Sequence, residues 1–213
     1  MQSLKSLTFV SVIAIAASSA AAAPPPIVSQ GRGAATACAS CHGADGTGNA
    51  QAGFPALAKM PAAYFVKQIS DFQAGTRSNP IMTPIAKAMS AEDTQAAANY
   101  YAGQPRLKAQ PSNAEAAVVA RGETLAINGA WSEGVPPCFK CHAADGSGVG
   151  AAFPPIAGQH ATYTVNQLQA WKTGARKNDP QSLMKTVAEK LSDDDIRSVA
   201  EYLATLSGQE AKK

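Results

Sequence analysis

Several residue types are scarce in this chain of 213 residues. It contains four cysteines and three histidines, and aromatic residues make up only 6% of it. Charged residues make up 15%, and the formal net charge of +3 is too small to favour nucleic acid as a partner. Alternating apolar and polar runs of the kind that form strands are almost absent, so the sequence favours an all-α fold.

Long apolar runs are also absent after the N-terminus, and no later segment could span a bilayer. At the N-terminus, Lys5 precedes a largely apolar run over residues 7–17, and small residues follow it at 18–23. This order is typical of a secretory signal peptide, so we expect residues 1–23 to be removed on export. An uncleaved membrane anchor is the alternative, because the run reaches the lower length limit of a spanning helix.

The scarce cysteines and histidines are concentrated in two pentapeptides, Cys38-Ala39-Ser40-Cys41-His42 and Cys138-Phe139-Lys140-Cys141-His142. Two thiols three residues apart can add to the two vinyl groups of one haem, and the adjacent histidine can then bind the iron. The pentapeptides use all four cysteines and leave no odd thiol. The sequence therefore predicts two covalently attached haem c groups.

Three other uses of paired cysteines are alternatives at this point. A structural zinc site spaces its cysteine pairs by about 15–20 residues, whereas these pairs begin 100 residues apart. A thioredoxin-like redox pair requires a strand–helix–strand pattern, which the sequence does not contain. Structural disulfides suit an exported protein, but they do not explain a histidine directly after each pair.

The sequence that follows the first pentapeptide recurs after the second, which indicates an internal duplication. A glycine-rich loop comes first in both copies, and then Phe54-Pro55 matches Phe153-Pro154. Further matches keep an offset of 99 residues: Tyr64, Gln68, Phe72, Gly75, Arg77 and Asn79 correspond to Tyr163, Gln167, Trp171, Gly174, Arg176 and Asn178. The chain is therefore predicted to contain two copies of one fold.

Each copy is predicted to contain three helices joined by loops. The expected ranges are 29–39 and 113–127 for the first helix, and 61–73 and 161–173 for the second. The third helix is expected to start at Ser90 and Ser192, because each serine is followed by acidic residues that favour a helix N-terminus.

A polar, proline-containing stretch over residues 105–112 separates the copies and has the composition of a linker. The predicted domains are therefore residues 24–104 and residues 113–213, each a small helical fold wrapped around one haem. Copy two also inserts residues 128–137, a loop rich in turn residues. Its Trp131 is expected over the haem edge or at the domain interface.

The sixth position on each iron decides between an electron carrier and an enzyme. Met60 and Met89 align with other residue types in copy two, whereas Met82 and Met184 form a pair, 40 and 42 residues after the two motif histidines. Both are predicted to lie in a loop between the second and third helices. We expect both to bind iron, which leaves no vacant position for a substrate. A role as core filler is the alternative.

The two pentapeptides, the segment at 153–163, the methionine loops and the final helices resemble the dihaem cytochrome c4 family over nearly all of the chain after residue 23. The resemblance implies two class I cytochrome c domains with His/Met ligation at both haems. The haem-binding residues that it implies are Cys38, Cys41, His42 and Met82 for the first haem and Cys138, Cys141, His142 and Met184 for the second.

The resemblance also implies a role in the periplasm, as a one-electron carrier rather than an enzyme. Its implied partners are a quinol-cytochrome c reductase or a periplasmic dehydrogenase as donor and a terminal oxidase as acceptor, with loose membrane association left open. Two alternatives remain. One is a dihaem enzyme, such as a small peroxidase or a thiosulfate dehydrogenase-like protein. The other is a dedicated cytochrome subunit of one dehydrogenase.

Several polar residues have two interpretations. Arg77 and Arg176 could pair with haem propionates or lie in solvent. Asn79 and Asn178 could orient the methionine loops or form ordinary turns. His160 is part of a Gly-Gln-His turn that copy one lacks, and we expect it at the surface or near a propionate.

Overall fold

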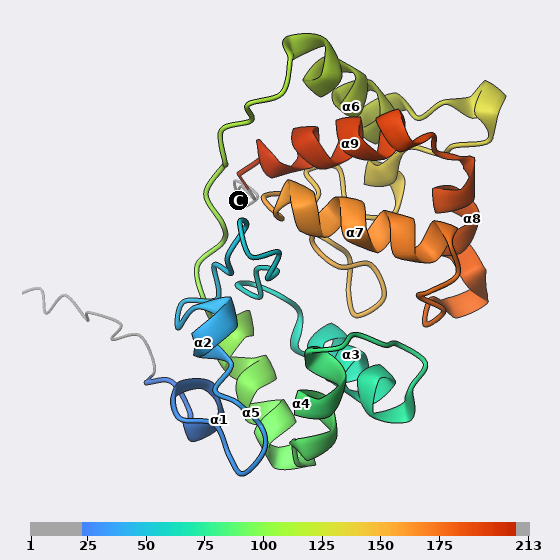
Figure 1. Cartoon of the computed structure of the whole chain (residues 1–213). Coiled ribbons are helices and arrows are strands. Elements are labelled where there is room, and N and C mark those ends of the chain that lie inside the picture. Colours follow the sequence, from blue (N-terminus) through green and yellow to red (C-terminus); the bar gives the residue numbers. More distant parts are fainter. Residues whose placement is uncertain (1–22, 208–213) are drawn as a thin grey trace, which may run out of the picture.

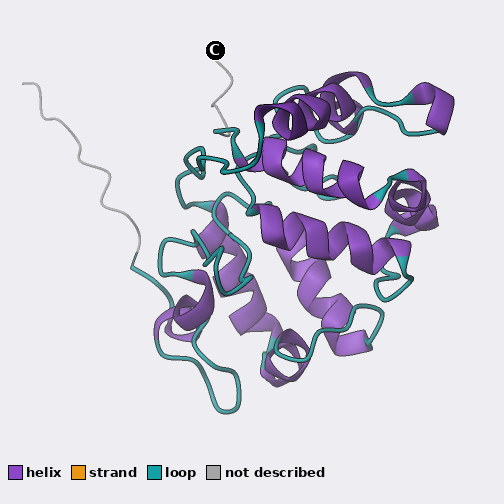
Figure 2. Ribbon diagram, turned by 45° about the horizontal axis from the view of Figure 1, so that its top comes forward, coloured by secondary structure: helices purple, strands orange, loops and turns teal. Residues whose placement is uncertain are grey.

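The computed structural model describes residues 23–207, and within that range it consists of helices and loops with no strand (Figure 2). The signal-peptide prediction therefore lies almost wholly outside the described residues. No helix in the described range is long and apolar enough to cross a membrane. The α-helices are α1 (Pro26–Ser29), α2 (Ala39–His42), α3 (Ala62–Ala74), α4 (Met82–Ala88), α5 (Ala91–Ala102), α6 (Ala116–Asn128), α7 (Ala161–Lys172), α8 (Leu183–Lys190) and α9 (Asp193–Ala204).

Two separate apolar cores divide these helices into two groups. Ile27, Phe65 and Tyr101 are among the buried residues of one core, and Leu125 and Leu203 are among those of the other. Figure 1 shows α1–α5 below and α6–α9 above, with the linker running along one side. We call these groups the first domain and the second domain. The all-α fold of two tandem helical domains is confirmed, while the predicted boundaries stay a prediction.

The second and third predicted helices of each copy are confirmed, as α3 and α7 and as α5 and α9. Helix α3 ends at Gly75, which adopts the left-handed conformation that glycine tolerates best. Helices α5 and α9 begin where the serines predict. The Oγ of Ser90 accepts a hydrogen bond from the backbone N of Asp93 at 3.0 Å, and Ser192 forms a capping box with Asp195.

The prediction for the first helix of copy one is wrong. Helix α1 has only four residues, and the chain leaves it through Gly31 at φ +78°. A Cβ at Gly31 would lie 2.5 Å from the carbonyl oxygen of Ala35, so the backbone turns too tightly for a helix over 29–39. In copy two, α6 covers the predicted range closely and crosses α9 at Gly122, where a Cβ would lie 2.0 Å from Ser198 O.

The predicted set of three helices per domain is also incomplete. Each domain has a further short helix where the methionine loop was expected, α4 in the first and α8 in the second. The pentapeptides form helical turns as well, as α2 and as the 3-10 helix η2 (Cys138–Lys140). The two remaining 3-10 helices are η1 (Trp131–Glu133) and η3 (Pro180–Ser182).

Candidate haem sites

The two pentapeptides form the same turn in both domains. The backbone N of His42 donates to Cys38 O at 2.9 Å, and that of His142 donates to Cys138 O at 3.0 Å. All four cysteines are free thiols, so the structure does not support the disulfide alternative. Burial raises the pKa of the Cys38 and Cys138 thiols to about 11.

Each motif histidine is buried and is oriented by one backbone carbonyl. The Nδ1 atom lies 2.8 Å from Pro55 O in His42 and 2.8 Å from Pro154 O in His142. Because a carbonyl oxygen can only accept, Nδ1 carries the proton and Nε2 keeps its lone pair. Burial lowers the pKa of both histidines, and the hydrogen bond to the carbonyl opposes this only in part. A neutral imidazole with a free Nε2 is the form that binds iron.

The glycine-rich loop after each pentapeptide holds in place the proline carbonyl that accepts from the histidine. In the first domain, the N of Gly48 donates to His42 O at 2.8 Å, and the backbone N atoms of Leu57 and Ala58 donate to Gly46 O. A Cβ at Gly48 would lie 2.6 Å from Phe54 O, so only glycine fits there. The same bonds recur in the second domain, and the repeated sequence therefore folds into a repeated histidine support.

The paired methionines lie in the first turn of the short helices rather than in a loop. Met82 is the first residue of α4, and Met184 is the second residue of α8. Both side chains are partly buried and pack against the core of their own domain. Met89 is a buried core residue, as its alignment with Leu191 predicts. The two candidate ligands thus occupy corresponding places in the two domains.

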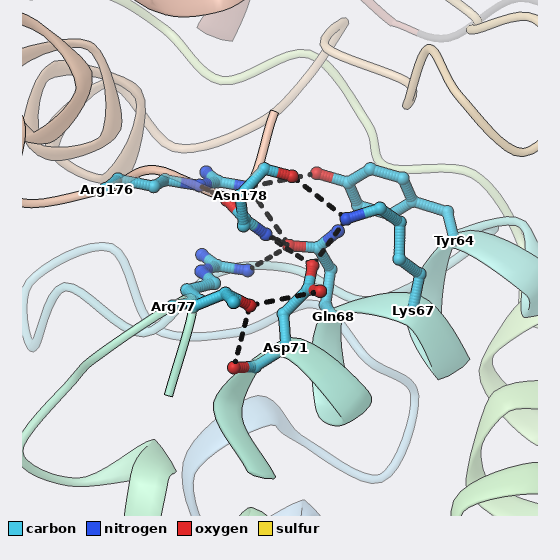
Figure 3. A network of polar contacts seen from close by, with 8 residues as sticks. Tyr64, Lys67, Gln68, Asp71, Arg77, Arg176 and Asn178 are labelled. Atoms are coloured by element: carbon cyan, nitrogen blue, oxygen red, sulfur yellow. Dashed lines mark hydrogen bonds and ion pairs between the residues drawn. The ribbon is translucent and has the colours of Figure 1, made fainter. Parts of the chain in front are cut away.

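Arg77 and Arg176 are buried between the domains, with 9% and 5% of their surface exposed, so the solvent alternative is wrong. Each donates through Nη1 to the glutamine of its own domain and through Nη2 to the tyrosine and glutamine of the other. We call this set the arginine clasp, and Figure 3 shows part of it. Its members are Tyr64, Gln68, Arg77, Tyr163, Gln167 and Arg176.

The clasp brings two positive charges together without a carboxylate. Among the described residues, neither guanidinium hydrogen-bonds to an acidic side chain. Burial and the neighbouring charge of Arg77 lower the pKa of Arg176. Burial alone would raise the pKa of Tyr163, but the two arginines lower it below its ordinary value. Because a buried charge is costly without a partner, we expect an anion to bind near these two cations.

A second unpaired group lies beside the clasp. The guanidinium carbon of Arg176 lies 3.9 Å from the ring centroid of Trp171, whose buried Nε1–H has no hydrogen-bond partner. A donor without a partner and two cations without an anion suit the propionate carboxylates of haem. The paired thiols and the free Nε2 atoms suit its vinyl groups and its iron. The residues present therefore fit haem c.

Two further side chains of the second domain reach into the first. The amide of Gln159 accepts from the backbone N of Ala56 at 3.0 Å and donates to Ala56 O at 3.1 Å. His160 is only 5% exposed, and its Nε2 lies 2.9 Å from Thr47 O. The expectation of a surface position for His160 is therefore wrong. Trp131 is 70% exposed, so it does not pack in the domain interface.

The sequence reasoning missed the interdomain role of Gln159. Its signal was the Gly-Gln-His turn that occurs in copy two alone. Copy one has Met60 at the corresponding position, whereas the amide of Gln159 contacts a backbone segment of the first domain.

Comparison with known proteins agrees with this geometry. The cytochrome c family model matches residues 28–110 and 119–207. The thiosulfate dehydrogenase electron acceptor of Stutzerimonas stutzeri (strain A1501) is 49% identical over 177 residues, which cover 83% of this chain and 82% of that protein. The cytochrome c4 of Pseudomonas aeruginosa is 38% identical over 180 residues, covering 84% and 88%.

A solved structure has the same fold within a longer chain. The thiosulfate dehydrogenase of Marichromatium purpuratum superposes with a TM-score of 0.78 at 41% identity. The match covers 85% of this chain but only 39% of that one. The two family matches, the two pentapeptides and the cytochrome c4 relatives lead to one conclusion: the chain belongs to the cytochrome c family, as an electron-transfer protein of the dihaem cytochrome c4 type that binds haem c covalently.

Proposed function

We propose that each domain holds one haem c through the residues that the sequence predicts. Those residues are Cys38, Cys41, His42 and Met82 for the first haem and Cys138, Cys141, His142 and Met184 for the second. The observation that carries the proposal is the repeated histidine support, in which a proline carbonyl fixes Nδ1 and leaves Nε2 free in both domains. The corresponding positions of Met82 and Met184 support the axial pairs.

When bound, haem supplies a one-electron Fe(III)/Fe(II) couple. A histidine and a methionine of each domain would hold each iron, which would leave no vacant position for a substrate. The thioether of methionine would favour the reduced iron. Arg77 and Arg176 would neutralise the propionates inside the interface. These features support electron transfer without substrate chemistry.

We infer that the protein works in the periplasm and accepts electrons from a thiosulfate dehydrogenase. The relative at 49% identity is named for that role, whereas the cytochrome c4 of P. aeruginosa is 38% identical. The solved relative carries this fold inside a thiosulfate dehydrogenase chain, which supports a dedicated partner. A quinol-oxidising complex as donor stays the alternative, and a terminal oxidase is the acceptor expected from the resemblance.

Rapid mixing of the oxidised protein with a purified thiosulfate dehydrogenase and thiosulfate tests this proposal. We expect both haems to be reduced within the enzyme's turnover time, and no reduction when the enzyme is omitted. The cytochrome c4 of P. aeruginosa serves as the matched acceptor and should be reduced more slowly. Failure of the enzyme to reduce the protein, together with fast reduction by a quinol-oxidising complex, would contradict the assignment of the donor.

We also propose the domain limits of 24–104 and 113–213 and the removal of residues 1–23 on export. The non-helical stretch between α5 and α6 supports the linker at 105–112. Mass spectrometry of the protein from a periplasmic fraction tests the processing. The mass should equal that of a chain beginning near Pro24 plus two haems, and a full-length mass would contradict the proposal.

A further inference from the structure

The arginine clasp is nearly symmetric, but three residues beside it break that symmetry. Lys67 and Asp71 project from α3 of the first domain, and Asn178 lies on the second-domain loop that leads to α8 (Figure 3). The positions that correspond to Lys67 and Asp71 in the second domain are Asn166 and Ala170, which carry no charge. We call Lys67, Asp71 and Asn178 the hook.

The hook joins the two domains through a carboxylate. The Nδ2 of Asn178 donates to Asp71 Oδ2 at 2.6 Å and to Gln68 Oε1 at 2.9 Å. The Nζ of Lys67 pairs with the same carboxylate and also donates to Asn178 O at 2.9 Å. The Nε of Arg176 donates to Asn178 Oδ1 at 2.8 Å, so every polar atom of the Asn178 side chain is engaged. The amide can therefore adopt only one orientation.

The corresponding asparagine of the first domain acts locally instead. The Oδ1 of Asn79 accepts from the backbone N atoms of Ile81 and Met82, both at 2.9 Å. Asn79 thus supports the start of α4 from within its own domain. Asn178 does not cap α8, and Asp179 accepts from the backbone N of Lys185 there at 2.9 Å. The first methionine segment is held by its own domain, whereas the second is held by Asp179 of its own domain and also by contacts from across the interface.

We propose that Asp71 and Lys67 of the first domain are positioning residues for Met184 of the second. Met184 follows Asn178 with only five residues between them, so fixing the one restricts where the other can lie. The side chain of Asp71 is only 17% exposed, which makes its hydrogen bond stronger than a surface contact. Loss of the hook would loosen the thioether and lower the potential of the second haem, while the first haem keeps its own support. This inference rests on the proposed ligand role of Met184.

The test compares Asp71→Ala and Asn178→Ala with Asn79→Ala in the complete dihaem protein. Amide hydrogen exchange is the first readout. Both hook variants should speed exchange over residues 182–187 by about tenfold or more and leave residues 82–87 unchanged. Asn79→Ala should show the reverse pattern. The double variant Asp71→Ala/Asn178→Ala should add little to either single change, because both remove the same bond.

The second readout is the reduction potential of each haem. It is measured together with the weak absorption band that a methionine ligand gives to ferric haem in the oxidised protein. Both hook variants should lower the potential of the second haem alone and weaken its share of the band. Asp71→Asn retains an acceptor for Asn178 and should restore most of the exchange protection. A lower melting temperature with both potentials unchanged, or a change confined to the first haem, would overturn the inference. If Met184→Ala itself leaves the band intact, the ligand assignment fails instead.

Discussion

The two domains share one haem-binding sequence but differ in how they contact each other. Both domains contribute side chains to the arginine clasp and the hook, but the second domain also extends Gln159 and His160 across the interface. These two side chains contact backbone atoms of Ala56 and Thr47 in the first domain. The histidine supports are therefore alike in the two domains, whereas Gln159 and His160 give the second domain contacts that the first domain does not mirror.

A second difference lies at the start of each domain. The second domain begins with α6, a helix of 13 residues that crosses α9, whereas the first begins with α1, a helix of four residues. Helix α1 corresponds only to the last turn of α6, since Gly31 and Gly129 form matching turns after them. The second domain thus depends on a close helix crossing that the first does not contain.

The largest effect that separates the domains is expected at this crossing. Gly122→Ala would place a methyl group 2.0 Å from Ser198 O and force α6 away from α9. We expect the second domain to lose about 3 kcal/mol of unfolding free energy, at the upper end of overpacking costs. Chemical denaturation, monitored by hydrogen exchange in α9, measures this loss of unfolding free energy. In the first domain, a Cβ at Gly103 would lie 3.4 Å from Tyr100 O, an ordinary van der Waals contact, so Gly103→Ala should be nearly neutral. Equal effects would contradict the comparison.

The next effect concerns the side chains that cross the interface. Gln159→Ala leaves the buried backbone N and O of Ala56 without hydrogen-bond partners. Each buried polar group without a partner costs about 1–3 kcal/mol. We expect the two domains to separate more readily, seen as faster proteolysis of residues 105–112. Gln169→Ala makes the same chemical change at an exposed contact with Asp193 within the second domain. It should leave the linker protected, and equal cleavage of the two variants would count against the interface.

Acid is expected to weaken the second domain through Asp195. Burial alone would raise the pKa of Asp195, but its bonds to Arg121 and Ser192 lower it below the ordinary value of 3.8. A carboxyl with a lowered pKa stabilises the folded state above its ordinary pKa, and this stabilisation is lost as the pH falls through the folded value. Melting temperatures below about pH 4 should therefore fall less steeply in Asp195→Asn. An identical pH slope in both proteins would disprove this contribution.

The smallest effect lies at a corresponding turn where the two sequences differ. Lys59 adopts φ +60° in the first domain, where the second has Gly158 at φ +75°. A residue other than glycine is strained by about 1–2 kcal/mol in the left-handed backbone conformation. Glycine removes part of this strain, but it loses more backbone entropy on folding. Lys59→Gly should therefore stabilise the first domain by about 0.5–1 kcal/mol. Gly158→Ala should destabilise the second, because Leu107 Cβ lies 3.0 Å from the added methyl. Thermal melts of both variants test whether the two changes in stability have opposite signs.

Local patterns predicted the parts of this molecule that local physics determines. The cysteine spacing predicted two covalent haem groups, and Ser90 and Ser192 located two helix starts, because capping depends on neighbours three residues away. The short α1 was missed, since the tight turn at Gly31 depends on a carbonyl four residues on. The arginine clasp was missed because Arg77 meets Gln167 across 90 residues of sequence. The only sign of the clasp in the sequence was that its arginine, glutamine and tyrosine positions match between the two copies.

A spectroelectrochemical titration of the mature protein and of its Met82→Ala and Met184→Ala variants tests the central claim most directly. The account predicts two one-electron centres and a methionine absorption band at about 695 nm in the oxidised protein. Each variant should lose half of that band and lower the potential of the haem in its own domain. A single centre, or an unchanged band in either variant, would contradict an electron carrier with two His/Met haems.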